Sequence, residues 1–396
     1  MFQDLDELKP DALVEISKRF RADNRPGKLD LGVGVYRDSD GSSQILGVVK
    51  RAELLLLNSQ TTKSYLPAGG DTDFIKLMTS MILGSESIAV ADGRVAAVQC
   101  PGGTGAFHQA LALVKQCSKN PTVWVGEPTW PNHLPMLKYH NFAVKTYKYY
   151  DVAKKSLQFD QMLSALQSAK AGDLILLHGV CHNPTGADLS YDQWKQVVLL
   201  AKNKALIPLI DFAYQGFGQG NDEDARGVRL LAEVLPEALI AASCSKSFGL
   251  YRERIGILVS VSGNRETANI ISATLHSLAR LNYSNPPDHG GGIVRTILAD
   301  PTLRSQWAGE LSDMRQRVRD LRQALAEQGR KQSFDLDFID NQSGLFATFD
   351  LHPTQVQVLA KKHAIHMSET GRINISGLTM NEIERFVCAV RSVTNG

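Results

Sequence analysis

The chain alternates apolar segments of strand length with amphipathic segments of helix length over most of its sequence. Near-continuous apolar runs indicate strands buried on both faces, as in a parallel sheet. We expect strands at 95–99, 123–125, 173–180, 205–210, 239–242 and 255–261. Apolar residues that recur every three or four positions predict helices at 46–58, 74–83, 106–116 and 193–203. The alternation predicts an α/β fold with a mostly parallel sheet.

The N-terminal segment has a different pattern. Residues 1–12 resemble an arm, and Asp11 is expected to cap a helix at 12–21. The stretch 28–36 predicts a short strand interrupted by glycines, among them Gly34. Such glycines permit either the close approach of a backbone or ligand or a simple bulge, and the sequence favours neither interpretation.

The C-terminal third begins with a long helical pattern. Pro301 opens a run in which apolar residues recur every three or four positions, a length that suits a connector between domains. From about residue 334, short strand and helix patterns alternate, and Arg372 falls on one of the short strands. A lone arginine is usually a surface residue, so Arg372 by itself indicates little.

Composition excludes several classes of protein. The 396 residues are 43% apolar and 21% charged, with a net charge of +2, which is ordinary for a globular enzyme large enough for two domains. Neither nucleic-acid nor membrane partners are expected from this charge balance. No apolar run reaches the roughly 18 residues of a membrane span. The acidic start, MFQDLDELKPD, does not resemble a signal peptide.

The five cysteines are odd in number and lack CxxC spacing. This usage fits reduced thiols in a cytoplasmic protein, and we expect no metal site.

A glycine-rich turn carries the first chemical signal. The strand at 95–99 runs into Pro101-Gly102-Gly103-Thr104-Gly105 and then into the helix at 106–116. A turn of this kind presents backbone N–H groups and a helix N-terminus to a phosphate. The turn lacks the G-x-G-x-x-G spacing of dinucleotide folds and the lysine of a P-loop, so a single phosphate is predicted.

Further polar residues follow the other predicted strands. Trp130 lies in a loop stiffened by two prolines, where a ring serves either the core or stacking on a flat ligand. Asn183 follows the strand at 173–180, and Asp211 closes the next strand, with Tyr214 three residues later. Ligand groups in open α/β sheets gather at such strand ends, and a buried acid there requires a cationic partner.

Lys246 lies in Ser243–Gly256, SCSKSFGLYRERIG, on a predicted turn between two apolar segments. Small neighbours, including Ser243 and Ser245, leave its amine uncrowded, the setting in which a lysine becomes a nucleophile. A surface lysine is the alternative for this turn taken alone. Together with Arg254, however, the strand-end groups match what pyridoxal phosphate requires: a lysine for its aldehyde, a carboxylate for its ring nitrogen, and N–H groups and an arginine for its phosphate.

The whole chain resembles the class I aminotransferases, in the branch of aspartate and aromatic amino acid aminotransferases. The resemblance rests on the motifs LGVGVY, PGGTGA, PTWPNH, CHNPTG, DFAYQGF, SCSKSFGLYRERIG, NYSNPP and GRINI. It implies a type I pyridoxal-phosphate transferase fold: a large domain (44–312) with a mostly parallel seven-stranded sheet, and a smaller α/β domain built from 13–43 and 313–396, after an arm at 1–12. It also implies a homodimer with shared active sites.

The resemblance also implies roles for individual residues. The catalytic residues would be Lys246, which forms the Schiff base and moves the proton, Asp211 at the ring nitrogen, and Tyr214. The cofactor would contact Tyr65 of the neighbouring subunit, Gly102, Gly103, Thr104, Trp130, His133 behind Asp211, Asn183, Asp211, Tyr214, Ser243, Ser245, Lys246 and Arg254. The substrate would contact Gly34, Trp130, Asn183, Arg372 at its α-carboxylate, and Arg280 of the other subunit at a distal carboxylate.

The implied reaction is a ping-pong transamination from an aromatic or dicarboxylic amino acid to a 2-oxo acid such as 2-oxoglutarate. Arg280 favours dicarboxylic substrates. Ser43 and Ser64 differ from the threonine and asparagine that the strict aspartate type tends to have, and the run Tyr65-Leu66-Pro67 is closer to the aromatic enzymes. A strict aspartate aminotransferase is the alternative.

Three rival interpretations have less support. Ser243-x-x-Lys246 with Tyr283-Ser284-Asn285 would suit a serine acylase, but the chain lacks the third motif, Lys-Thr/Ser-Gly. A lyase or decarboxylase with the same cofactor does not need both arginines, Arg280 and Arg372. A cofactor-binding regulator would need a DNA-binding segment or basic arm, which the sequence does not show.

Overall fold

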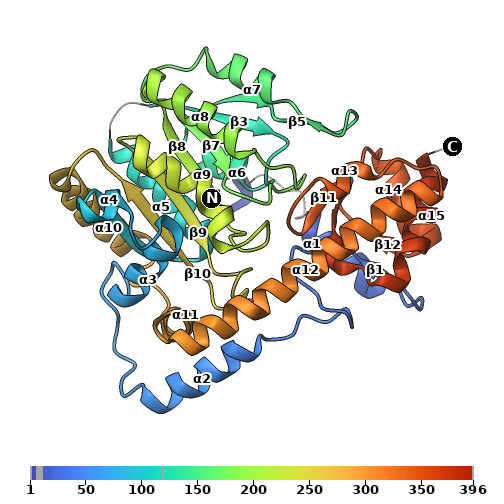
Figure 1. Ribbon diagram of the computed structural model, residues 1–396, viewed down its shortest axis with the longest axis horizontal. Helices are drawn as coiled ribbons and strands as arrows, with labels where there is room; N and C mark the ends of the chain where they lie inside the picture. Colours follow the sequence, from blue (N-terminus) through green and yellow to red (C-terminus); the bar gives the residue numbers. More distant parts are fainter. Residues whose placement is uncertain (1, 6–11, 118–119, 395–396) are drawn as a thin grey trace. The chain divides into compact units, whose positions relative to one another are not determined.

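A seven-stranded sheet forms the centre of the larger of two structural units (Figure 1). The computed structural model describes residues 2–5, 12–117 and 120–394. One unit comprises Gln44–Gln316 with Gln342–Gly344, and the other comprises Met1–Ser43, Arg317–Asn341 and Leu345–Gly396. Asp11 and most of the expected arm at 1–12 lie outside the described residues.

The sheet is mostly parallel, as expected. Its strands, in spatial order, are β2 (Val95–Pro101), β10 (Ile255–Val261), β9 (Ala238–Ser243), β8 (Ile207–Phe212), β7 (Leu174–His178), β3 (Thr122–Glu127) and β4 (Ala143–Lys148). Only β10 runs antiparallel to its neighbours, β2 and β9. The first residue of β10 therefore lies at the same edge as the last residues of the other strands.

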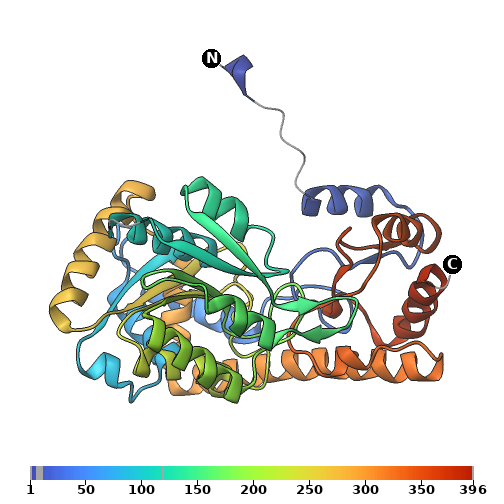
Figure 2. The ribbon, with the colours of Figure 1, turned by 90° about the horizontal axis from the view of Figure 1, so that it is seen from above.

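Helices cover both faces of this sheet (Figure 2). The helices of this unit are α2 (Gly47–Ser59), α3 (Thr72–Leu83), α4 (Ile88–Ala91), α5 (Gly102–Gln116), α6 (His133–Tyr139), α7 (Phe159–Leu166), α8 (Tyr191–Lys204), α9 (Asn221–Val234), α10 (Arg265–Asn282) and α11 (His289–Ala299). A short hairpin, β5 (Tyr150–Asp151) and β6 (Ser156–Leu157), completes the unit. One core cluster joins alternate strand residues, such as Leu209 and Leu258, to Phe107 of α5 and Leu275 of α10. The period-two alternation of the strands thus supplies a separate apolar surface to each helical layer.

Two local differences from the sequence-based expectation have clear causes. α5 begins at Gly102, not at Ala106, so the glycine turn is the first turn of the helix. Glycines lower helix propensity, which conceals the start of this helix in the sequence. Only Leu29–Asp30 of the expected strand at 28–36 forms β1, because the Asn374 side chain binds the carbonyls of Val33 and Val35 in place of a strand partner, each at 2.7 Å.

The second unit has its own apolar core. It contains α1 (Ala12–Ala22), β1 (Leu29–Asp30), α13 (Asp337–Asp340), β11 (Phe346–Thr348), α14 (Pro353–His363), β12 (Ile365–His366), β13 (Arg372–Asn374) and α15 (Ile383–Thr394), with 3-10 turns at Phe2–Asp4, Ile375–Gly377 and Met380–Glu382. β1 pairs with β12 in parallel, and β11 pairs with β13 antiparallel. The expected long helix is α12 (Pro301–Lys331), which is continuous in sequence through both units.

None of the helices that the structure describes is both long enough and apolar enough to span a bilayer.

Candidate active site

The strand order brings several sequence-distant loops to one edge of the sheet. Ile255 of β10 is paired with Pro101 of β2, and Gly256 is paired with Ser243 of β9. Arg254 therefore lies beside the start of α5 and the end of β9. A single antiparallel strand thus adds an arginine to an edge that otherwise collects the carboxyl ends of strands.

One cavity at this edge is lined by most of the residues that the sequence predicts for the site. Its lining residues are Gly103, Thr104, Phe107, Trp130, Asn183, Asp211, Ala213, Tyr214, Ser243, Ser245, Lys246 and Arg254. Phe107 and Ala213 were not anticipated, because apolar side chains carry no chemical signature in a sequence. The sequence signals that could have identified them are the position of Phe107 one helical turn after Gly103 and the position of Ala213 between Asp211 and Tyr214.

The other predicted residues lie elsewhere. Gly102 precedes the cavity residue Gly103, and His133 contacts Asp211 without lining the cavity. Tyr65 and Arg280 line a different pocket of the same unit, together with Ser64. Gly34 and Arg372 belong to the other unit.

Arg254, Ser243, Ser245, Gly102 and Gly103 lie together at the start of α5, and this part of the site is called the anion pocket below. Arg254 donates from Nη1 to Ser245 Oγ at 3.3 Å and to the Tyr251 carbonyl at 3.0 Å, and the Ser245 N–H donates to Ser243 Oγ at 3.1 Å. Gly102 has a φ of +75°, and a Cβ built there would lie 2.5 Å from Arg254 Nη2. Because α5 starts at Gly102, the first N–H groups of this helix, which have no partner within a helix, belong to the same region, and such a set of donors suits a phosphate group.

Asp211 is the acid of the cavity, and histidines lie behind it. His133 Nε2 lies 3.3 Å from Asp211 Oδ2, and Thr129 holds His133 Nδ1 at 2.8 Å. Burial would raise the pKa of Asp211, but the hydrogen bond from His133 and the fields of His133, His178 and Lys246 outweigh it and lower the pKa. The carboxylate therefore stays ionised and can pair with a protonated ring nitrogen of a ligand.

His178 and His182 extend this row away from the cavity. The His178 ring stacks on His133 at 5.3 Å and meets His182 edge-on at 4.2 Å. Burial lowers the pKa of His178 to about 3 and that of His182 well below its usual value. The sequence did not single out either residue.

Ligand atoms of His133, His178 and Asp211 lie within 4.8 Å of one another, the spacing of a possible metal site. The sequence predicted no metal site. The Asp211 carboxylate also lines the cavity, where it can meet an organic ligand.

Lys246 extends into the cavity from the turn between β9 and β10. Its Nζ lies 5.3 Å from the centroid of the Tyr214 ring. The turn is held from behind, because Trp307 Nε1 donates to the Ser247 carbonyl at 2.8 Å and its ring stacks on Phe248 at 4.6 Å. The lysine is thus a flexible side chain on a rigid turn.

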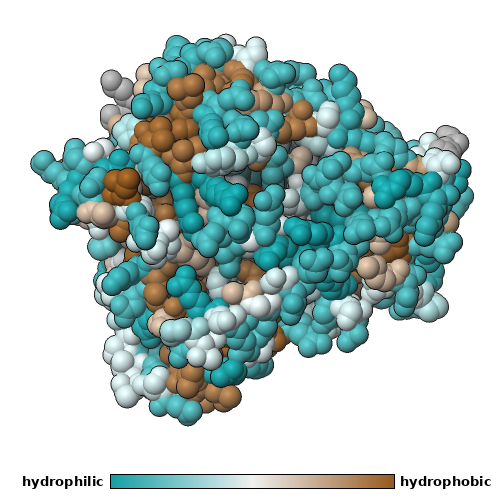
Figure 3. Space-filling view, viewed as in Figure 1, coloured by the Kyte–Doolittle hydropathy of each residue, from teal (hydrophilic) through white to brown (hydrophobic). Residues whose placement is uncertain are grey.

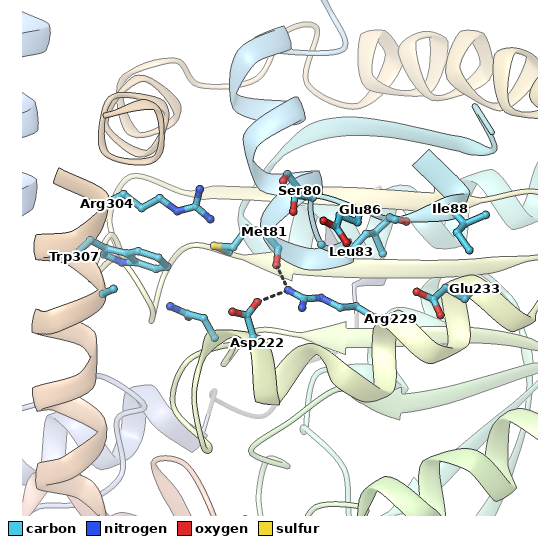
Figure 4. Close-up of a pocket in the computed structure, with 15 residues that line it drawn as sticks. Ser80, Met81, Leu83, Glu86, Ile88, Asp222, Arg229, Glu233, Arg304 and Trp307 are labelled. Carbon is cyan, nitrogen blue, oxygen red and sulfur yellow. Dashed lines mark hydrogen bonds and ion pairs between the residues drawn. The ribbon is translucent and has the colours of Figure 1, made fainter. Parts of the chain in front are cut away.

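A second cavity of this unit lies behind that turn and contains none of the predicted site residues (Figure 4). Arg229 crosses it and donates to Asp222 at 2.7 Å and to the Met81 carbonyl at 3.2 Å. Trp307, the residue that supports Ser247, forms part of its wall. Nε of Arg229 also donates to the Ile82 carbonyl, so Nε and Nη2 are both hydrogen-bonded within the protein.

Arg372 is buried within the smaller unit, contrary to the usual surface position of a lone arginine. Its side chain is held by the Gly32 carbonyl at 2.7 Å, and its guanidinium lies over the Phe346 ring at 4.6 Å. A buried and oriented guanidinium is suited to bidentate recognition of a carboxylate.

Comparison with known proteins places this geometry in a family. Residues 26–390 match the family described as aminotransferase class I and II. The tyrosine aminotransferase of Rhizobium meliloti (strain 1021) is 44% identical over 382 residues, which cover 96% of this chain and 97% of the relative. The aspartate aminotransferase of Escherichia coli (strain K12) is 39% identical over 397 residues, covering 99% and 100%.

A solved structure agrees in fold and in cofactor chemistry. The aromatic-amino-acid aminotransferase of Burkholderia pseudomallei, described as covalently bound to pyridoxal phosphate, superposes with a TM-score of 0.96 at 36% identity, covering 99% of each chain. The expected fold class is therefore confirmed. With a family match over nearly its whole length and relatives near 40% identity, the chain belongs to the class I and II aminotransferases, which use pyridoxal phosphate.

Proposed function

We propose that this aminotransferase moves the amino group of an aromatic or dicarboxylic amino acid to a 2-oxo acid such as 2-oxoglutarate. The observation that carries the proposal is the meeting of Lys246, Asp211 and the Arg254 anion pocket in one cavity. These three groups match the aldehyde, the ring nitrogen and the phosphate of pyridoxal phosphate.

When bound, pyridoxal phosphate supplies an aldehyde for the amino group and a ring that accepts electrons. The N-terminal turn of α5, Ser243, Ser245 and Arg254 would hold its phosphate. Asp211 would keep a proton on the ring nitrogen, and His133 would hold Asp211 in place. Tyr65 of a neighbouring subunit would complete the phosphate contacts.

Lys246 has two tasks in this proposal. Its amine would bond the cofactor in the resting enzyme and, once displaced by the substrate, would move a proton between the substrate Cα and the cofactor. The turn held by Trp307 keeps the Cα of Lys246 fixed, while its four-carbon side chain supplies the reach. Tyr214 and Asn183 would donate to the ring oxygen, and Trp130 would stack on the ring.

Substrate binding needs positive charge at both ends of a dicarboxylic amino acid. Arg372 would bind the α-carboxylate, helped by Asn183 and the Gly34 backbone. Arg280 of a second subunit would bind the distal carboxylate of aspartate or glutamate.

A homodimer with shared active sites forms part of the proposal. Tyr65 is 92% exposed in the single chain and lines a pocket with the exposed Arg280. Helix α2 exposes Leu54, Leu55 and Leu57. In Figure 3, brown apolar patches lie among white and teal side chains in the region of α2. An apolar surface next to two isolated site residues suits an interface with a second copy.

We further propose that the domains follow the family pattern, with an arm at 1–12, a cofactor domain at 44–312 and a small domain from 13–43 and 313–396. The five cysteines form no disulfide, and such cysteine usage supports a cytoplasmic location.

The substrate class rests on relatives of both kinds, one named for tyrosine and one for aspartate. A strict aspartate aminotransferase is the alternative, favoured by Arg280.

The decisive experiment follows the half-reaction. Purified protein with pyridoxal phosphate is mixed with phenylalanine, tyrosine, aspartate or glutamate without a 2-oxo acid, and the cofactor absorbance and released 2-oxo acid are measured. We expect one equivalent of 2-oxo acid per site from both substrate classes, and none from Lys246→Ala. Lys195→Ala, at an exposed position on α8, is the matched control and should behave as wild type. Decarboxylated product, or no product, would refute the proposal.

A further inference from the structure

Asp188 is an acidic side chain that no predicted role includes, and it holds the loop that carries Asn183. Its Oδ2 accepts from the Cys181 N–H and its Oδ1 accepts from the His182 N–H, each at 2.9 Å. Cys181 has a φ of +52°, a conformation that a residue with a side chain rarely adopts. One carboxylate thus binds two consecutive N–H groups, one of them from the strained residue Cys181, immediately before Asn183.

Internal hydrogen bonds make the rest of this loop rigid. The Gly186 N–H donates to the His182 carbonyl at 2.6 Å, and Thr185 Oγ1 bonds His182 Nδ1 at 2.8 Å. Asn183 is 5% exposed and lines the cofactor cavity. Displacement of Cys181 and His182 would therefore be transmitted directly to Asn183.

A distant segment of the chain is fastened to the same loop. The Ser343 N–H donates to the Gly186 carbonyl at 2.8 Å, and the Ser343 side chain hydrogen-bonds Asp188. Gly344, with a φ of +75°, packs so closely on Cys181 that an added Cβ would lie 2.3 Å from the Cys181 Cβ. Asp188 therefore contacts both the Cys181–Gly186 loop and the Ser343–Gly344 segment, which lie about 160 positions apart in the sequence.

Burial of the ionised Asp188 carboxylate between these two segments has a desolvation penalty. Burial raises the pKa of Asp188 to about 6, and the charge of Asp224 acts in the same direction, while the bonds from His182, Cys181 and Ser343 oppose the shift. A residue that only filled space here would not need a charge, because an apolar side chain avoids the desolvation penalty. The two backbone N–H groups explain why an acid is suited to this position.

We propose that Asp188 is a positioning residue that fixes Asn183 at the cofactor cavity by holding the N–H groups of Cys181 and His182. The inference rests on the proposed function, in which Asn183 donates to the ring oxygen of pyridoxal phosphate. Loss of a hydrogen-bond donor to that oxygen disfavours its ionised form. The midpoint of the pH-dependent absorbance change of the bound cofactor should therefore move to higher pH.

The test is a double-mutant cycle on the holoenzyme with Asp188→Asn, Asn183→Ala and the double variant. In Asp188→Asn, the new side-chain amide could accept from only one of the two N–H groups and would direct its NH₂ at the other. The absorbance of the bound cofactor is titrated from pH 5 to 9. We expect Asn183→Ala to raise the midpoint by about one pH unit, which is a tenfold change in the acid constant. Asp188→Asn should raise it by a comparable amount, and the double variant no more than Asn183→Ala.

Asp192→Asn, an acid exposed on the first turn of α8, is the matched control and should leave the midpoint unchanged. If Asn183→Ala moves the midpoint and Asp188→Asn does not, or if the two shifts add, the inference is overturned. If Asn183→Ala itself leaves the midpoint unchanged, the proposed role of Asn183 fails instead. If Asp188→Asn does not fold, Ser343→Ala takes its place, because it removes one hydrogen bond to the Asp188 carboxylate. Ser343→Ala should then raise the midpoint by a smaller amount. An unchanged midpoint in Ser343→Ala would overturn the inference.

Discussion

His133 and Asp211 are paired at the back of the cofactor cavity, with His133 Nε2 3.3 Å from Asp211 Oδ2. His133 does not line the cavity, whereas Asp211 does. The histidine therefore leaves one face of the carboxylate available to a ligand while it lowers the pKa of the acid. A permanently ionised carboxylate is what a protonated pyridine nitrogen requires.

Replacing Asp211 with asparagine keeps the shape of this side chain and removes its charge. We expect kcat/KM to fall about a thousandfold or more, about 4 kcal/mol, because the ring nitrogen would lose its proton and the ring its capacity to accept electrons. Steady-state kinetics with the best substrate would measure the loss. Asp192→Asn, exposed on α8, should change kcat/KM by less than about twofold. A loss below about tenfold in Asp211→Asn would show that the charge is not needed.

His178 should make the protein less stable at acid pH. Burial holds the pKa of His178 near 3 in the folded chain, whereas an unfolded histidine binds its proton near pH 6.5. Below about pH 6.5 the unfolded state binds more protons, so folding free energy is lost as the pH falls toward 3. Its neighbours Asp211, His133 and His182 remain in the variant His178→Gln and serve as a constant background.

Urea unfolding of the holoenzyme at fixed protein and cofactor concentration would measure this effect. Between pH 7 and pH 5, the wild type should lose about 2 kcal/mol more than His178→Gln. Equal losses in the two proteins would mean that His178 is protonated in the folded state.

A methyl group at Gly102 should weaken cofactor binding. The added Cβ would lie 2.5 Å from Arg254 Nη2 and would require a φ of +75°, so Gly102→Ala must displace the arginine of the anion pocket. We expect the Kd of pyridoxal phosphate to rise at least about tenfold, measured by titration of the apoenzyme. Gly172→Ala is the matched control, because Gly172 has a φ of +86° but no atom within 4 Å of the added Cβ. If both variants weaken binding equally, backbone strain and not the arginine is responsible.

Polar and ionisable residues that lie at the end of an apolar strand could be identified from the sequence. Asp211 and Lys246 were singled out because strand ends in a parallel sheet meet at one edge, whereas the role of Ser243 was implied by the family resemblance. Phe107 was missed because an apolar helical residue has the same pattern whether it faces a core or a cavity. Asp188 was missed because its function is to bind backbone N–H groups, which have no sequence signature.

Errors in the expected elements arose where side chains replace regular backbone pairing. The chain after Asp30 has strand-like residues, but the Asn374 amide binds two of its carbonyls, and this partner is more than 300 positions away. No local pattern could reveal it. The same limit applies to the buried Arg372, which donates to the carbonyl of Gly32, 340 positions away.

Substrate choice provides the final test, through Arg280. This arginine is exposed in the single chain, where it lines a pocket with Tyr65 and Ser64. If it binds the distal carboxylate of a dicarboxylic substrate, Arg280→Ala should lower kcat/KM for aspartate about a hundredfold or more, because one charged hydrogen-bonded contact is worth about 3 kcal/mol. The value for phenylalanine should change by less than about threefold, since an aromatic ring has no carboxylate for the arginine to bind. Arg265→Ala, at the exposed start of the same helix α10, is the control and should affect neither substrate. In the wild type, a kcat/KM for phenylalanine about a thousandfold below that for aspartate would restrict the enzyme to aspartate-type substrates. In Arg280→Ala, an equal loss of kcat/KM for both substrates would show that this arginine does not bind the distal carboxylate.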